Sequence, residues 1–205
     1  MLDTWATALR KPARTLFVVD VGGSMGNPAA GGTESKLDLA KRAASEALKD
    51  LGPNDTVGLW TFPTNDGSQF ERAADLTTTA RSTSELVRGL VLLRGSSDED
   101  SLYATIRASV DEVRAGFAPD RINAVVVLTG GGFPLQSQKA SELVAYLQGQ
   151  READRIRLFM VAYGTSPASN AVLKLITESS GGAFYDATDP AYTASEWVRN
   201  AMSNF

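Results

Sequence analysis

The 205-residue sequence contains neither cysteine nor histidine. Without cysteine the chain can form no disulfide, no thiolate zinc site and no cysteine nucleophile, and cysteine usage gives no information about its redox compartment. Without histidine, the Ser-His-Asp and Cys-His catalytic arrangements are excluded as well. Any metal site must therefore be built from oxygen ligands, which suit Mg, Ca or Mn.

Basic residues and long apolar runs are also scarce. Twenty Lys and Arg stand against 24 Asp and Glu, which gives a net charge of -4 and a pI near 4.9. Binding to a phosphate backbone needs clustered cations, so we expect no nucleic-acid partner. No stretch approaches the ~18 apolar residues of a membrane span, and the first residues do not form a signal-peptide pattern, so we expect no membrane span in this chain.

The rest of the composition is typical of a globular domain, with 43% hydrophobic and 21% charged residues. No repeat, linker or low-complexity segment divides the chain. We therefore predict a single domain over residues 1–205, with its core at about 14–202.

Segments with strand character alternate with segments of helical periodicity. Strands are expected at 14–20, 56–62, 69–76, 122–128, 156–163 and 183–185, and helices at 35–51, 82–92, 101–116, 137–150, 169–179 and 190–203. A turn at Asn65-Asp66-Gly67 favours an antiparallel hairpin between the second and third strands. The other strands are separated by helices, which implies parallel pairing with right-handed crossovers. The predicted fold class is α/β: a three-layer α/β/α, doubly wound, mostly parallel six-stranded sheet with one antiparallel edge strand.

The strongest candidate for function is Asp20, which ends an apolar strand and is followed by Gly22, Gly23 and Ser24. Ligands of open α/β sheets bind at the carboxyl ends of the strands. A carboxylate there needs a cation or hydrogen-bond donors to offset its desolvation. Asp20 therefore either belongs to a ligand site or accepts hydrogen bonds from the amides of its own turn. Ser24 has the same two interpretations, a cation ligand or a turn stabiliser, and the glycines bring no ligand of their own.

This stretch resembles the first motif of the von Willebrand factor type A (vWA) family, Asp-x-Ser-x-Ser, which here reads Asp20-x-Gly22-x-Ser24. In that family the motif belongs to a metal-ion-dependent adhesion site (MIDAS), whose divalent cation is used to bind partner proteins. The resemblance runs from about Arg14 to about Met202. It implies a Rossmann-like vWA fold and a role in protein interaction.

Two further positions carry the resemblance. The family has a threonine ligand two residues before a Leu-Tyr pair, and the matching residue before Leu102-Tyr103 is Asp100. The family also has an aspartate in a Leu-Thr-Asp-Gly setting, and the matching residue after Thr129 is Gly130. The resemblance therefore implies a degenerate metal site that keeps Asp20 and Ser24.

Asp100 has two interpretations. It lies just before a predicted helix, where it can cap the helix N-terminus. Alternatively, it compensates for the aspartate lost at Gly130, so that the metal ligands are Asp20, Ser24 and Asp100. We expect no tightly bound cofactor, and at most weak binding of Mg, Ca or Mn, because each missing ligand must be replaced by water.

The resulting expectation is a non-enzymatic protein-interaction domain of adhesion or scaffold type with a weakened or lost metal site. Its partner is a protein or another domain of the same full-length protein, and the oligomeric state is left open. The alternative is a Mg-dependent hydrolase or phosphotransfer enzyme that uses the acidic residues of this edge. The resemblance implies bacterial relatives, in some of which such a domain is part of a longer exported protein, so an extracytoplasmic location is an expectation from the resemblance alone. The expected partner contacts are Gly23, Asp98, Glu99, Ser101, Thr129, Gly131 and Phe133.

Overall fold

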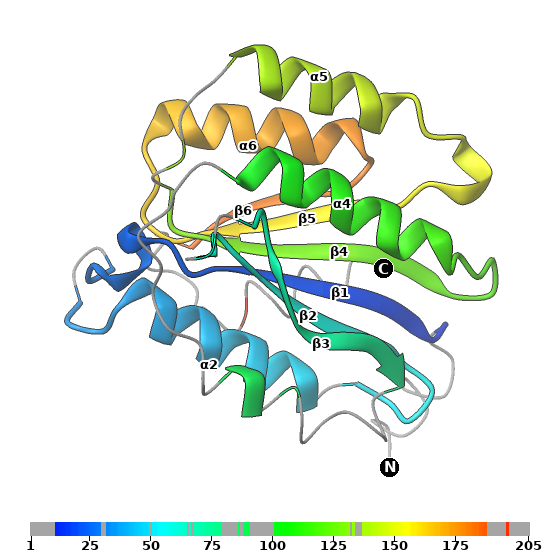
Figure 1. The fold of residues 1–205 in the computed structure, drawn as a ribbon, viewed down its shortest axis with the longest axis horizontal. Helices are drawn as coiled ribbons and strands as arrows, with labels where there is room; N and C mark the ends of the chain where they lie inside the picture. The colour runs from blue at the N-terminus through cyan, green and yellow to red at the C-terminus, as the bar shows by residue number, and fades with distance from the viewer. Residues whose placement is uncertain are drawn as a thin grey trace.

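A computed structural model of the chain describes residues 11–29, 32–49, 51–64, 66, 68–78, 86, 88–90, 101–131, 133, 137–187 and 196. Its centre is a six-stranded sheet in the order β3-β2-β1-β4-β5-β6 (Figure 1). The strands are β1 (Ala13–Asp20), β2 (Thr56–Phe62), β3 (Glu71–Thr78), β4 (Ile122–Thr129), β5 (Arg157–Ala162) and β6 (Phe184–Asp186). Only the edge strand β3 is antiparallel to its neighbour. The predicted fold class is confirmed.

Helices cover both faces of the sheet. Figure 1 shows α4 (Leu102–Ala115), α5 (Ser137–Gln148) and α6 (Pro167–Ser179) on one face, and α2 (Lys36–Lys49) on the other. Short 3₁₀ segments, η1 (Gly23–Gly26) and η2 (Glu152–Asp154), follow β1 and α5. None of the helices in the described part of the chain is long and apolar enough to cross a membrane.

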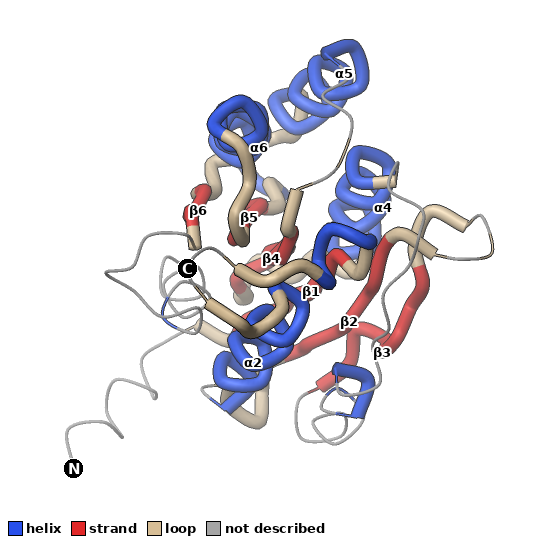
Figure 2. Tube along the Cα trace, turned by 90° about the vertical axis from the view of Figure 1, so that its left-hand side faces the viewer, coloured by secondary structure: helices blue, strands red, loops and turns tan. Residues whose placement is uncertain are grey.

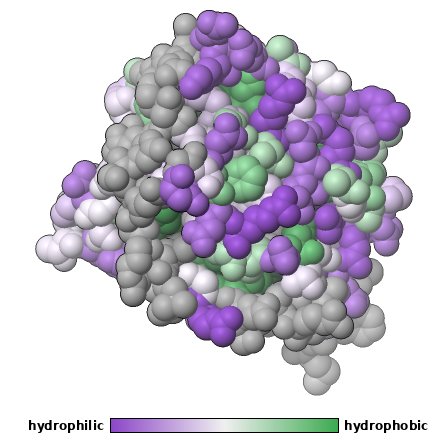
Figure 3. Space-filling view, in the orientation of Figure 1, coloured by the Kyte–Doolittle hydropathy of each residue, from purple (hydrophilic) through white to green (hydrophobic). Residues whose placement is uncertain are grey.

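The alternation of side chains along β1 divides the core into two layers. Phe17 and Val19 pack with the apolar residues of α2, whereas Leu16 and Val18 pack with those of α4, α5 and α6. A strand that is covered on both faces is apolar at nearly every position, which explains the continuous run before Asp20. The face of the molecule seen in Figure 3 is mainly hydrophilic, with hydrophobic atoms in small patches between polar ones.

The predicted elements lie at the expected places, with small differences at their ends. The third strand is Glu71–Thr78 and not 69–76, and the helix expected at 169–179 begins two residues earlier, at Pro167. Ser166 caps this helix by accepting a hydrogen bond from the backbone N–H of Ser169. Most of the helices predicted at 82–92 and 190–203 lies outside the described residues.

The parallel strands place one set of loops at a common edge. The loops after β1, β4 and β5 lie together there, and Figure 2 looks onto this edge. We call the described residues of these loops, 21–26, 130, 131, 133 and 163–166, the carboxyl-end rim.

Candidate functional site

Asp20, the last residue of β1, is buried beneath the carboxyl-end rim, with only 5% of its surface exposed. Its Oδ1 accepts a 2.8 Å hydrogen bond from the N–H of Gly22. Its Oδ2 accepts a 2.7 Å hydrogen bond from Thr129 Oγ1 and a 3.3 Å bond from the N–H of Gly130. Donors from its own turn and from the end of the adjacent strand β4 therefore offset the desolvation of this carboxylate.

Ser24 lies in η1, four residues after Asp20 in the sequence, and is half-buried. Its hydroxyl donates a 2.6 Å hydrogen bond to the carbonyl oxygen of Gly131, in the loop after β4. Gly131 has a φ of 77°, a conformation that L side chains rarely adopt, so glycine is favoured there. Ser24 thus joins the loop after β1 to the loop after β4, and Gly23 beside it is exposed.

Lys36, the first residue of α2, lies in the same site, and the sequence analysis did not single it out. Its Nζ donates hydrogen bonds to the carbonyl oxygens of Gly130 (3.0 Å) and Gly164 (3.1 Å). Only 9% of the residue is exposed. Burial lowers the pKa of the Lys36 ammonium, and the negative charge of Asp20 acts in the opposite direction. One weak signal was available, because a lysine in the first turn of a helix is unfavourable for the helix dipole.

Gly130 occupies the position at which the resemblance implies a lost aspartate. A Cβ atom here would lie 2.5 Å from Met25 Sδ and 3.1 Å from Lys36 Cδ. Met25 is fully buried, so its sulfur has little freedom to move. Any side chain at position 130 therefore competes with Met25 and Lys36 for the same space.

The start of α4 lies beside the loop after β4. The ring of Tyr103, in the first turn of α4, meets the ring of Phe133 edge to face at 6.1 Å between centroids. Tyr103 is buried and Phe133 is half-buried, so Phe133 is partly accessible on the rim. Ser101 precedes α4, and its Oγ is buried without a hydrogen-bond partner within the described structure. The hydroxyl of Thr129, by contrast, is engaged with Asp20 beneath the rim.

The structure thus brings together four of the positions that the vWA motifs pick out: Asp20, Gly22, Ser24 and Gly130. Asp98, Glu99 and Asp100 lie outside the described residues, so their predicted roles as metal ligand or partner contacts stay predictions. Among the described motif positions, Asp20 and Ser24 are the two whose side chains offer an oxygen to a cation. Across the described ranges there is no group of three or more Asp, Glu, His or Cys that could hold a metal ion.

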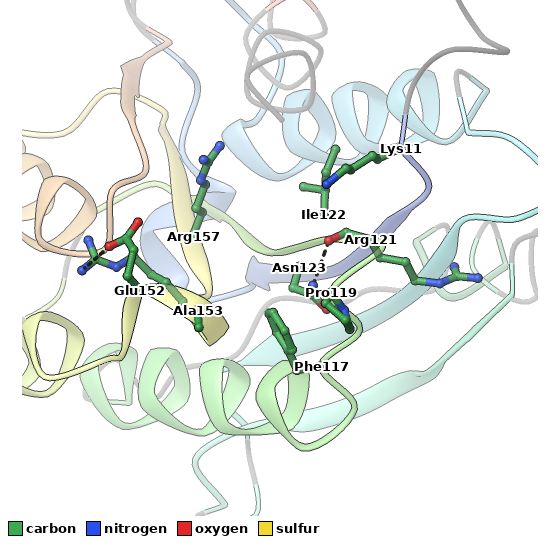
Figure 4. Close-up of a pocket in the computed structure, with 10 residues that line it drawn as sticks. Lys11, Phe117, Pro119, Arg121, Ile122, Asn123, Glu152, Ala153 and Arg157 are labelled. Carbon is green, nitrogen blue, oxygen red and sulfur yellow. Dashed lines mark hydrogen bonds and ion pairs between the residues drawn. The ribbon is translucent and has the colours of Figure 1, made fainter.

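A second feature lies at the opposite end of the strands, where β1, β4 and β5 begin. A pocket of about 530 Å³ is lined by four cationic residues, one acid and several apolar or amide side chains: Lys11, Arg121, Arg155, Arg157, Glu152, Phe117, Pro119, Ile122, Asn123 and Ala153 (Figure 4). Glu152 forms an ion pair with Arg155 at 2.9 Å. Arg121 extends away from the pocket in Figure 4, toward the carbonyl oxygen of Asn54. The lining of the pocket is basic, whereas the chain as a whole has a net negative charge.

With this geometry in hand, comparison with known proteins identifies the family. Residues 15–133 match the model of the von Willebrand factor type A domain, and the chain belongs to this family. The resemblance found in its motifs is confirmed. Domains of this family typically act in protein interaction.

Several solved structures share the fold of this chain. The SpRpn10 VWA domain has a TM-score of 0.63 at 15% identity, with 92% of this chain and 95% of that chain covered. A von Willebrand factor type A protein from Catenulispora acidiphila has a TM-score of 0.64 at 18% identity, covering 93% of this chain and 42% of that one. The D319A mutant of the PilB minor pilin from Streptococcus sanguinis has a TM-score of 0.68 at 14% identity, covering 95% and 60%. These similarities concern the fold alone.

Among curated proteins, the chain is 24% identical over 188 residues to uncharacterized proteins of two Mycobacterium tuberculosis strains, CDC 1551 / Oshkosh and ATCC 25618 / H37Rv. The match covers 90% of this chain but only 27% of each relative. The chain therefore spans about a quarter of the length of these relatives.

Proposed function

We propose that the chain is a non-enzymatic interaction domain whose carboxyl-end rim binds a protein partner, or another domain of the same full-length protein, without a tightly bound divalent cation. The observation that carries this proposal is the environment of Asp20. Protein donors occupy both of its carboxylate oxygens, and the ammonium of Lys36 lies in the same site. A cation at Asp20 would have to compete with these donors and approach a positive charge.

The described residues do not fit a divalent-cation site for a second reason. Asp20 is a single carboxylate, and Ser24 adds only one hydroxyl oxygen, whose lone pairs stay available while its proton is donated to Gly131. Mg requires nearly octahedral coordination and gives up its own water reluctantly, so two protein oxygens beside the positive charge of Lys36 offer it little advantage over bulk solvent.

The contact between Thr129 and Asp20 also bears on catalysis. A hydroxyl that donates to a carboxylate at 2.7 Å is the geometry of a nucleophile beside a base. Here, however, Thr129 is fully buried and Asp20 is 5% exposed, so a substrate cannot reach the pair. This supports an interaction role over the hydrolase or phosphotransfer alternative. Mg-dependent turnover in a substrate screen would contradict the proposal.

A crosslinking experiment tests where the partner binds. A photo-crosslinking amino acid is placed at exposed Gly23 on the rim and, as a control, at exposed Lys174 on α6. We expect partner adducts from position 23 and few from position 174, with the same yield in EDTA and in MgCl₂. Adducts from position 174 alone would refute the proposed surface, and their loss in EDTA would refute metal independence.

Calorimetry tests the metal part directly. Titrating the chain with MgCl₂, CaCl₂ and MnCl₂ is expected to give weak binding or none. Tight binding of Mg by the unmodified chain would show that Asp100 restores the site.

A further inference from the structure

The negative charge of the buried Asp20 carboxylate has a positively charged neighbour, Lys36. The inference drawn from it rests on the proposed function. The donors from Gly22, Thr129 and Gly130 that hydrogen-bond to the buried carboxylate are neutral groups, so these bonds do not neutralise its charge. A unit negative charge in a poorly solvated site favours a nearby positive charge. Lys36 supplies one, and Asp20 stabilises its charged form.

Two hydrogen bonds also fix the position of the Lys36 side chain. It begins α2, and its ammonium reaches the carbonyl of Gly130, after β4, and that of Gly164, after β5. One side chain therefore joins the helix that follows β1 to the loops after two other strands. A buried ammonium is costly unless hydrogen bonds and a nearby opposite charge offset its desolvation; Lys36 donates two hydrogen bonds to carbonyl oxygens, and the charge of Asp20 favours its charged form.

The space beside Lys36 leaves no room for a side chain at position 130. Its Cδ atom and the sulfur of Met25 fill the volume that a side chain at Gly130 would need. The carboxylate that the family places at this position and the lysine of this chain therefore exclude each other in the present packing.

We propose that the Lys36 ammonium is the resident cation of the carboxyl-end rim, a protein-borne positive charge that balances Asp20 and joins α2 to the loops after β4 and β5 in place of a divalent ion. It follows that removing this charge exposes a divalent-cation dependence that the unmodified chain lacks. A purely mechanical role, in which Lys36 only holds two carbonyl groups, predicts no such dependence.

The first test measures the thermal stability of the chain and of Lys36→Met in EDTA and in millimolar MgCl₂, CaCl₂ or MnCl₂. The melting temperature of the unmodified chain should not change. That of Lys36→Met should be lower in EDTA and should rise by about 2–4 °C with at least one cation, as expected when a ligand binds the folded state only. Lys49→Met, on the exposed face of the same helix, is the matched control and should show no cation effect.

The second test separates charge compensation from the hydrogen bonds. In a double-mutant cycle, Lys36→Met should cost clearly less in an Asp20→Asn background than in the unmodified chain, because the charge that it balances is absent. If Lys36→Met does not fold, Lys36→Gln, which keeps a donor but no charge, replaces it in both tests.

The outcomes separate this inference from the proposed function. Additive effects in the cycle together with no cation response in the lysine variants would overturn the resident-cation role and leave a metal-independent rim intact. Strong stabilisation of the unmodified chain by Mg would instead refute the metal independence of the proposed function, whatever the variants do. Coupling in the cycle with a cation response confined to the lysine variants would support both.

Discussion

Thr129, the last residue of β4, donates its hydroxyl to the carboxylate of Asp20, the last residue of the adjacent parallel strand β1, at a distance of 2.7 Å. Both residues are buried, and Val19 pairs with Leu128 just before them. The register of two parallel strands thus delivers an acceptor and its donor to the same point. This contact links the stability of the sheet edge to the geometry of the rim above it.

Replacing Thr129 with Val should therefore lower the free energy of unfolding by about 1.5–3 kcal/mol, the range for a lost hydrogen bond to a charged group. Urea denaturation at neutral pH measures this. Thr129→Ser keeps the hydroxyl and is the control, with a much smaller expected loss. No loss in Thr129→Val together with a clear loss in Thr129→Ser would mean that the hydroxyl is unimportant and that only the methyl group matters.

Gly130→Ala should destabilise the chain by about 1–3 kcal/mol, because the added Cβ overlaps Met25 Sδ. In a Met25→Ala background the same substitution should cost much less, which a double-mutant cycle would detect. Gly26→Ala is the control, since a Cβ there meets no atom within 4 Å. An aspartate at position 130 meets the same obstacle, so restoring the family residue alone is expected to fail. Additive effects of Gly130→Ala and Met25→Ala would contradict this account.

Tyr163 provides a prediction about pH. It is 1% exposed, its hydroxyl has no hydrogen-bond partner within the described structure, and burial raises the pKa of its phenol above the usual value. The unfolded chain therefore loses this proton first as the pH rises past about 10, and the folded state is destabilised at alkaline pH. Tyr163→Phe should remove this part of the alkaline loss, and at pH 7 it should raise stability by about 1 kcal/mol by deleting a buried unpaired hydroxyl.

The control for this prediction is Tyr146→Phe. The Tyr146 hydroxyl donates to Asp111 and accepts a 2.8 Å hydrogen bond from Arg114, so its removal at pH 7 should not stabilise the chain. Chemical denaturation of the three proteins between pH 7 and 11 makes the comparison. An undiminished alkaline loss in Tyr163→Phe would show that other groups are responsible.

Asn123, which lines the basic pocket at the other end of the strands, should stabilise the backbone before β4. It is 6% exposed, and its side-chain amide donates to the carbonyl oxygens of Ala118 (2.8 Å) and Arg121 (3.0 Å) while accepting from the N–H of Ala118 (3.3 Å). Asn123→Ala should cost about 1–3 kcal/mol because these backbone groups lose their partner. Asn123→Asp should be no better, since a carboxylate cannot donate to two carbonyls. Recovery of stability in the Asp variant would indicate that only the bond from Ala118 N–H matters.

Much of the fold follows from local patterns in the sequence. The run before Asp20 is apolar because β1 is covered on both faces, and the alternation of such runs with amphipathic helices predicted the parallel sheet. The antiparallel pairing of β2 and β3 followed from the turn residues between them. The ends of the elements differ from the prediction by a few residues, as at Pro167, because capping and packing set them jointly.

The same local patterns predicted only part of the candidate site. The sequence by itself determined that Asp20, Ser24 and Gly130 lie at one edge of the sheet, because parallel strands bring their carboxyl ends together. It also determined that any metal ligands are oxygens, because the chain has no cysteine or histidine. Only the tertiary structure decided that Lys36 enters this edge and that Met25 fills the space beside Gly130. A long side chain finds its partners through the docking of its helix on the sheet, and no local spacing in the sequence encodes that docking.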